Sequence, residues 1–278
     1  MSISEKYLAL AARLDAALPA ADVVGLHLPQ PVPDETFRDE FGFVLLADGS
    51  VGPFYVSLGG LLRELWRRYP DPAAVRLSRQ TLLQGFAASD LATRALAVGA
   101  YNALSHSLMR RTGYRPPARA PEKESGALTP GQRVGLVGYF CPVVDRLVEA
   151  GMEVLVLEQA PQRVPERERV MATTEPRGLA TCAQVLCTAS VLVNDTLDGL
   201  LRAAAGAASF QLIGPTGSGL PDVLFAHGIT AVGGIEFGDA AQLLERLGRG
   251  EPWGKAGRKY EITPESYPGV DALLARLP

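Results

Sequence analysis

The chain has 278 residues, which fits two ordinary domains better than one. Its content of 47% hydrophobic and 21% charged residues is typical of a folded globular protein and excludes a disordered one. A formal net charge of −3 and an aromatic content of 7% argue against a nucleic-acid-binding protein, so we expect no nucleic acid among its partners.

The N-terminal half predicts a small α+β domain. An apolar stripe at helical spacing predicts a helix over residues 4–18. Short apolar runs predict strands over residues 23–28, 41–46 and 52–58. Asp48-Gly49 is a hairpin turn signal between the last two, so these strands should form an antiparallel meander. Helices are then expected over residues 61–66, 74–87 and 90–109.

A break in composition follows. Residues 110–127 contain three prolines, two glycines and many charges, and no apolar period survives there. This composition is typical of a linker between domains. We therefore predict an N-terminal domain over residues 1–111, a linker over residues 112–127 and a ligand-binding domain over residues 128–278.

The second half predicts a Rossmann-like α/β domain. Short apolar runs predict strands over residues 133–137, 153–157, 184–188, 209–213 and 230–232. Helices are expected between and after them, over residues 142–150, 196–204, 220–227 and 240–247. Strands that alternate with helices through short links indicate a mostly parallel sheet with right-handed crossovers.

The sequence also predicts a soluble cytoplasmic protein. No apolar run is long enough to cross a bilayer, and the first residues lack the basic start and apolar stretch of a signal peptide. Cys141, Cys182 and Cys187 cannot all pair within the chain, so free thiols in a reducing compartment are expected. We expect no membrane partner. The sequence leaves open whether the chain forms a homodimer.

The first candidate binding loop is Gly138-Tyr139-Phe140, at the end of the first predicted parallel strand. Ligands of open α/β sheets bind beyond the carboxyl ends of the strands. Gly138 would let the backbone approach a ligand, and the helix start that follows offers N–H groups to an anion. The spacing is not that of the dinucleotide fingerprint, so an ordinary tight turn is the alternative.

Glu158 ends the second predicted strand of this domain. A carboxylate at that position accepts hydrogen bonds from ribose hydroxyls in nucleotide-binding folds. This residue is the strongest argument in the sequence for a nucleoside-containing ligand. The alternative is a solvent-exposed surface glutamate.

Two further loops carry small polar residues at strand ends. In the third loop, residues 188–196, side-chain oxygens and helix N–H groups should converge on a ligand, although simple helix capping is the alternative. In the fourth loop, residues 214–219, three glycines would let the backbone wrap tightly around a ligand. A mobile lid or an ordinary turn would have the same composition. The candidate ligand-binding residues of these loops are Thr188, Ser190, Asn194, Thr196, Gly214, Pro215 and Thr216.

Asn102, His106 and Cys141 are the remaining candidates. Asn102 and His106 lie among apolar neighbours on the long predicted helix and could face a cleft between the domains. Cys141 lies near a helix start, where it could act as a nucleophile or a soft metal ligand, or simply pack. The three histidines are scattered, which argues against a dedicated zinc-hydrolase site.

These motifs occur in the same order as in a known family. The chain resembles the heavy-metal chelation family along nearly its whole length, both in the loops of the second half and in the helix that carries Asn102. The resemblance implies an enolase-N-terminal-like domain followed by a Rossmann-like domain, with a ligand cleft between them. The chain departs from the family pattern at Asp195, where glycine is more typical, and at Cys141, where an apolar residue is expected.

Two main functions stay open from the sequence. The first is binding of a heavy metal or a metal–organic complex, with Cys141 and His106 as metal ligands. The alternative is an enzyme that uses a nucleoside-type cofactor such as S-adenosylmethionine; a regulatory small-molecule sensor is a third option. In each case one pocket is expected between the domains, lined by Asn102, Tyr139, Glu158, Asn194 and Thr216.

Overall fold

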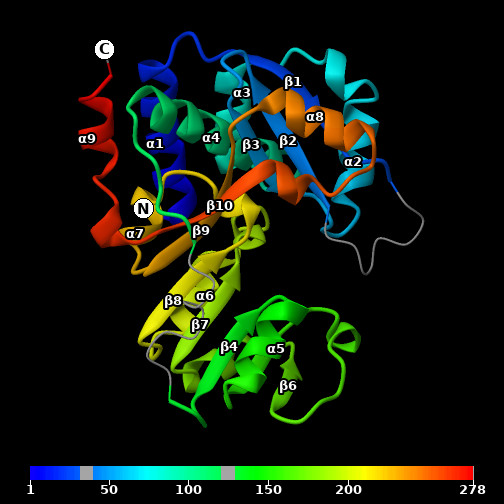
Figure 1. Ribbon diagram of the computed structural model, residues 1–278, viewed down its shortest axis with the longest axis vertical. Helices are drawn as coiled ribbons and strands as arrows, with labels where there is room; N and C mark the ends of the chain where they lie inside the picture. Colours follow the sequence, from blue (N-terminus) through cyan, green and yellow to red (C-terminus); the bar gives the residue numbers. More distant parts are fainter. Residues whose placement is uncertain (32–39, 120–128, 278) are drawn as a thin grey trace.

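The computed structural model describes residues 1–31, 40–119 and 129–277 (Figure 1). The N-terminal part contains an antiparallel sheet of order β1-β2-β3. Its strands are β1 (Val23–His27), β2 (Phe41–Leu46) and β3 (Val51–Tyr55). Gly49 has a φ of 81° in the turn between β2 and β3, and the Ser50 N–H donates to Asp48 Oδ1 at 2.9 Å. The predicted meander is therefore confirmed.

Helix α4 (Leu91–Arg111) packs on this sheet, and α1 (Ile3–Ala17), α2 (Leu61–Arg68) and α3 (Arg79–Gln84) pack against α4. Ser2 and Glu5 form a capping box at the start of α1, which satisfies N–H groups that the first turn leaves free. The single helix predicted over residues 74–87 is wrong. That segment contains the short turns η1 (Pro72–Ala74) and η2 (Gly85–Ala87), with α3 between them.

Helix α4 is buried on all sides between Ala95 and Met109. Strand β3 packs directly against it. The close approach depends on Gly52, because a Cβ atom there would lie 1.9 Å from the Gly99 carbonyl oxygen and 2.5 Å from the Ala103 nitrogen. A helix and a strand thus meet backbone to backbone at this point.

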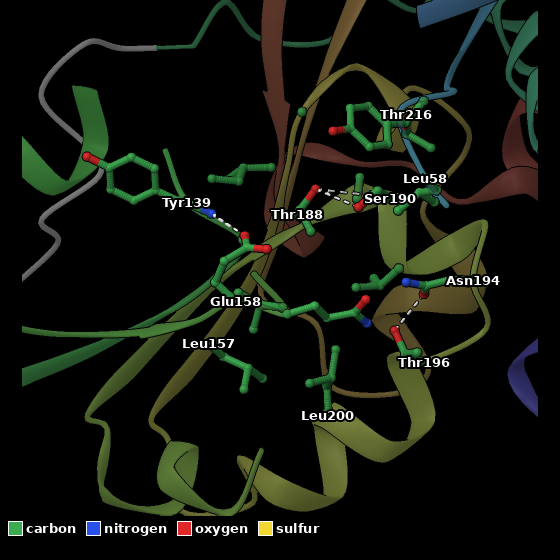
Figure 2. A pocket seen from close by; sticks show the side chains of 18 of the residues that line it. Leu58, Tyr139, Leu157, Glu158, Thr188, Ser190, Asn194, Thr196, Leu200 and Thr216 are labelled. Atoms are coloured by element: carbon green, nitrogen blue, oxygen red, sulfur yellow. Dashed lines mark hydrogen bonds between the residues drawn. The ribbon is translucent and has the colours of Figure 1, made fainter. Parts of the chain in front are cut away.

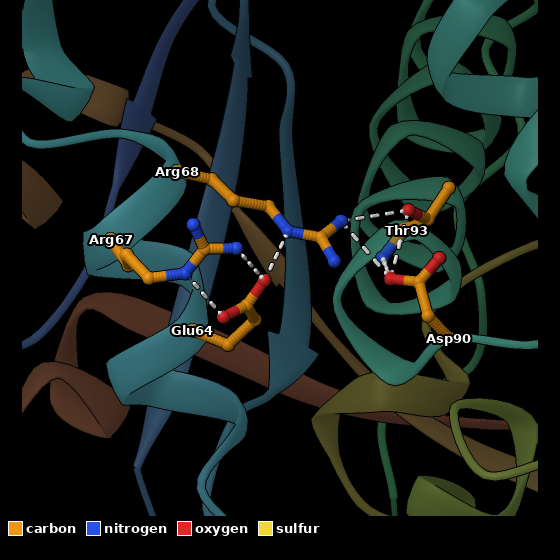
Figure 3. Close-up of polar contacts among 5 residues, drawn as sticks. All are labelled: Glu64, Arg67, Arg68, Asp90 and Thr93. Carbon is orange, nitrogen blue, oxygen red and sulfur yellow. Dashed lines mark hydrogen bonds and ion pairs between the residues drawn. The ribbon is translucent and has the colours of Figure 1, made fainter.

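A polar cluster fastens α2 to the first turn of α4 (Figure 3). The Glu64 carboxylate accepts two hydrogen bonds from Arg67, at 2.8 and 2.7 Å, and one from Arg68 Nε at 2.7 Å. These bonds hold the pKa of Glu64 at about 2. Arg68 Nη1 also lies 3.0 Å from both Thr93 Oγ1 and Asp90 Oδ1, and Asp90 caps α4. The cluster therefore fixes the angle between the two helices.

The second sheet has seven strands in the order β10-β9-β8-β7-β4-β5-β6, all parallel except β10. They are β4 (Arg133–Val137), β5 (Glu153–Leu157), β6 (Val170–Thr173), β7 (Gln184–Thr188), β8 (Ser209–Ile213), β9 (Ala231–Phe237) and β10 (Gly257–Ile262). The order reverses between β4 and β7, as in doubly wound folds. The predicted fold class, a small α+β part followed by a mostly parallel sheet, is confirmed.

Helices cover both faces of this sheet. Helix α5 (Cys141–Glu149) packs on one face and α6 (Leu197–Ala203) on the other. The second half also contains α7 (Asp222–Phe225), α8 (Ala240–Gly248) and α9 (Val270–Leu274). Alternate residues of β5 point to opposite faces: Val154 and Val156 pack with α5, whereas Leu155 packs in the core that contains α6. No helix in the described part of the chain is both long and apolar enough to cross a membrane.

The two parts share one hydrophobic core. One buried cluster contains side chains from both parts, including Ile3 on α1 and Leu273 on α9. Tyr101 on α4 donates its hydroxyl to the Leu220 carbonyl at 2.8 Å, and the Leu220 N–H donates to Ser105 Oγ at 3.1 Å. The division at residues 112–127 stays a prediction, and residues 120–128 lie outside the described residues.

Limited proteolysis tests this division. We expect the first cuts within residues 110–127, where the sequence is rich in proline and charge. The two pieces should then separate on a denaturing gel and still elute together from a sizing column, because they share a buried core. First cuts within residues 130–250 would contradict the predicted boundary, and separate elution would contradict the shared core.

Candidate ligand-binding cleft

A cavity of about 910 Å³ lies at the carboxyl ends of β4, β5, β7 and β8 (Figure 2). This is the edge at which the strand order reverses. The volume is within the range of small-molecule sites. The N-terminal part closes one side with residues that follow or belong to its sheet: Phe41, Tyr55, Ser57, Leu58 and Gly59. The cavity therefore lies between the two parts of the chain.

The Gly138 turn and Glu158 form one wall. Gly138 has a φ of 85°, which favours glycine, and its N–H donates to the Leu157 carbonyl at 2.9 Å. Glu158 Oε2 accepts the Tyr139 N–H and Oε1 accepts the Ala160 N–H, both at 3.2 Å. The Tyr139 N–H at this turn is thus already bonded to the carboxylate of the chain's own Glu158.

Hydroxyl groups form the floor, next to the switch in strand order. Thr188 Oγ1 and Ser190 Oγ lie 3.0 Å apart, and the Ser190 N–H is 3.3 Å from Thr188 Oγ1. The Thr196 hydroxyl donates to Asn194 Oδ1 at 2.7 Å. Among the described residues no side chain caps the start of α6. The Asn194 side chain is therefore turned toward the loop and is not a helix cap.

Asp195 has a backbone conformation that favours glycine. Its φ is 58°, a left-handed conformation that costs a residue with a side chain about 1 kcal/mol or more. The Asp195 carboxylate compensates by accepting from Arg94 Nη2 at 2.9 Å and from the Ser4 hydroxyl at 2.8 Å. Arg94 on α4 is 5% exposed. The loop that forms the cavity floor is therefore anchored to the N-terminal part.

Asn102 lies behind the cavity wall instead of in it. It is 1% exposed, and its Nδ2 donates to the carbonyls of Pro53 at 2.8 Å and Thr216 at 2.9 Å. Asn102 therefore fixes the Gly214–Thr216 loop, in which Gly214 has a φ of 110°. The Thr216 side chain lines the cavity and is 2% exposed, and its hydroxyl bonds to no described residue.

The structure does not bring the two predicted metal ligands together. Cys141 is exposed at the start of α5, with its thiol 3.5 Å from Asp145 Oδ2. His106 is buried on α4, where Nδ1 donates to the Val51 carbonyl at 2.7 Å and Nε2 lies 3.4 Å from the Tyr260 hydroxyl. Burial lowers the pKa of His106, so the imidazole is neutral. Neither residue lines the cavity that the described residues enclose.

The wall from the N-terminal part was not predicted. Phe41 and Tyr55 pack edge to face, with ring centroids 5.4 Å apart, beside the turn that follows β3. Gly59 and Gly60 both have positive φ in that turn. This pair of glycines between a strand and a helix was the available sequence signal. Arg163 and Arg202, which also line the cavity, carried no signal of their own.

Fold and cavity together define a two-part α/β protein with a cleft at the switch point of a Rossmann-like sheet. The chain belongs to the DUF364 family, whose description is "Putative heavy-metal chelation" and whose sequence pattern matches residues 124–264. The family resemblance seen in the sequence is therefore confirmed.

Three relatives illustrate the likeness. An uncharacterized protein of Methanocaldococcus jannaschii is 29% identical over 161 residues, which span 56% of this chain and 59% of that protein. A crystal structure of a DUF364 protein of unknown function from Pyrococcus horikoshii covers 95% of this chain and all of its own, at 22% identity and a TM-score of 0.68. A second one, from Desulfitobacterium hafniense, covers 93% of this chain and 98% of its own, at 20% identity and a TM-score of 0.64. At these identities the structures show a shared fold.

Proposed function

We propose that the chain binds a small organic ligand in the cleft, and that a heavy metal reaches it as a metal–organic complex held through the organic part. One observation carries this proposal. The cavity is about 910 Å³ and is lined by hydroxyl, amide, carboxylate and apolar groups, while the described residues contain no group of three metal-ligating side chains. Such a lining suits an organic molecule.

The donor chemistry does not fit a bare soft metal ion. Soft ions bind thiolates, and burial raises the pKa values of the Cys182 and Cys187 thiols, which keeps both protonated. Cys141 is exposed and has the Asp145 carboxylate as its neighbour, which is short of the ligand number that a tight site requires. We therefore assign no metal ligand among these cysteines.

A second candidate function is an enzyme with a nucleoside-type cofactor such as S-adenosylmethionine. Glu158 favours it, since the residue follows the strand next to β4, where nucleotide-binding folds place the carboxylate that binds ribose hydroxyls. Both candidates require the same organic ligand site at the Gly138 turn and Glu158.

Native mass spectrometry of freshly purified protein, together with metal analysis, tests the proposal. We expect a retained organic mass of small-molecule size, with any metal present in no more than equimolar amount to it. Equilibrium dialysis against bare Zn²⁺ and Cu²⁺ should show no stoichiometric tight binding. Tight binding of the bare ions without any organic mass would contradict the proposal.

The role of Glu158 has its own test. Glu158→Gln should weaken binding of S-adenosylmethionine by about 1–3 kcal/mol, because a charged acceptor is lost, and should lower the melting temperature slightly, because one of the two backbone N–H groups loses its acceptor. Calorimetric titration measures the first quantity and a thermal melt the second. Glu168→Gln is the matched control, since that side chain is 91% exposed and does not line the cavity. Equal affinities of the two variants for S-adenosylmethionine would show that Glu158 is a surface residue that does not bind the ligand.

Thr216 gives a test that needs no ligand. The Thr216 hydroxyl faces the cavity and is not a fully enclosed unpaired group, so Thr216→Val should change the free energy of unfolding of the ligand-free protein by no more than about 0.5 kcal/mol. Thr188→Val removes a hydroxyl that has partners and should lower the free energy of unfolding by about 1 kcal/mol. Denaturant unfolding of both variants measures the difference. A loss of stability in Thr216→Val as large as that in Thr188→Val would show that the hydroxyl is already satisfied in the free protein.

A further inference from the structure

We infer that the ligand carries no phosphate at the Gly138 turn and is an uncharged or cationic molecule with hydroxyl groups, of the class of an unphosphorylated nucleoside. The inference rests on the proposed organic ligand and specifies its chemistry. In dinucleotide-binding proteins of this topology, the turn after the first strand receives a phosphate on free backbone N–H groups. Here the turn between β4 and α5 holds that position.

A carboxylate already occupies the turn. Glu158 Oε2 accepts the Tyr139 N–H at 3.2 Å, so this donor is not free for a phosphate (Figure 2). The second oxygen is held by the Ala160 N–H at 3.2 Å, which fixes the carboxylate in place. A phosphate at the turn would therefore meet a like charge in a partly enclosed cleft, and like charges close together repel.

The helix start adds few donors. Pro142 is the second residue of α5 and has no N–H. The N–H groups of Val143 and Val144 both donate to the Phe140 carbonyl, at 2.9 and 3.0 Å. Of the backbone N–H groups between Tyr139 and Val144, those of Phe140 and Cys141 remain. Two donors make a poor phosphate cradle compared with the open first turn of a dinucleotide-binding helix.

Basic side chains do not compensate at this turn. Residues 138–142 contain no lysine or arginine. Arg167, which acts electrostatically on Tyr139, is paired with Asp145 at 2.5 Å. The arginines that line the cavity, Arg163 and Arg202, come from the segment after β5 and from α6. The turn itself therefore supplies no positive charge from its own residues.

Glu158 instead suits a ligand that donates hydrogen bonds. Each of its carboxylate oxygens carries one hydrogen bond from the backbone, which leaves lone pairs for ligand hydroxyls. Thr188 and Ser190 supply neutral polar groups beside it. A ribose hydroxyl with no attached phosphate, or a ligand with a positive charge near the turn, matches this arrangement.

Calorimetric titration with adenosine, S-adenosylmethionine, adenosine 5′-monophosphate and NAD tests the inference. We expect adenosine and S-adenosylmethionine to bind at least about tenfold more tightly than the two phosphate compounds, a difference of about 1.4 kcal/mol. Glu158→Gln should reduce this preference by weakening adenosine more than the monophosphate. Glu168→Gln should leave the preference unchanged.

Equal or tighter binding of the phosphate compounds would overturn the inference and leave the proposed organic ligand standing. An unchanged preference in Glu158→Gln would also overturn it, since the carboxylate would then not be its source. Failure of all four probes to bind would overturn the nucleoside class. In that case the organic mass in the native spectrum decides separately whether the proposed function holds.

Discussion

Replacing Arg94 with methionine is expected to lower the free energy of unfolding by about 3 kcal/mol, because it removes a buried guanidinium and leaves three backbone carbonyls without their donor. The guanidinium donates to the carbonyls of Phe86 at 2.7 Å, Leu192 at 3.2 Å and Val193 at 3.3 Å, besides the Asp195 carboxylate. Methionine fills similar volume and supplies none of these donors. Urea unfolding of the variant measures the loss.

Arg110→Met is the matched control for this variant. Arg110 lies on the same helix, is exposed and donates to the Asp48 carbonyl at 2.9 Å, so its loss should cost about 1 kcal/mol or less. A similar cost in both variants would show that burial of Arg94 contributes little. Asp195→Gly should cost less than Arg94→Met, since glycine relieves the left-handed backbone while it removes the ion pair.

Gly52→Ala is expected to lower the free energy of unfolding by about 3 kcal/mol or more, because overpacking against rigid backbone forces elements apart. The new Cβ would lie 1.9 Å from the Gly99 carbonyl oxygen, and neither β3 nor α4 can yield there without moving as a whole. The shift would also move Pro53, whose carbonyl holds Asn102. We therefore expect weaker ligand retention together with lower stability.

Gly248→Ala provides the contrast. Gly248 is the last residue of α8, has no positive φ, and a Cβ there would meet nothing within 4 Å. Alanine should raise stability by up to about 1 kcal/mol through its better helix propensity. Thermal and urea unfolding of both variants gives the comparison. A small effect of Gly52→Ala would mean that the helix and strand are not rigidly packed.

Much of the second sheet could be predicted from sequence because its central strands are buried on both faces. Strands β4, β5, β7 and β8 read as continuous apolar runs, and their bounds are confirmed. Two strands were missed. β6 is four residues long with an exposed centre, and β10 alternates charged and apolar residues on the antiparallel edge. Neither strand contains an apolar run that distinguishes its sequence from that of a loop.

The cleft was predictable where it follows from topology. The ends of parallel strands must meet at one edge, so the loops at Gly138, Glu158, Thr188 and Gly214 converge whatever their side chains do. The direction in which α4 presents Asn102 and His106 was not predictable in the same way, since it depends on long-range packing. A helix that is apolar all round is buried all round, so polar residues within it bond inside the core.

The shared core has a consequence for synthesis of the chain on the ribosome. Leu220 and Leu273 belong to the same buried cluster as Ile3 and Leu14, and α9 packs against α4. Arg13 near one end of the chain is also paired with Asp271 near the other. The N-terminal sheet and helices therefore emerge first but keep an apolar face open until residues 220–274 have been translated. We expect the nascent chain to need protection from aggregation during that interval, and the cleft to take its final form only after the last strand and helix have docked.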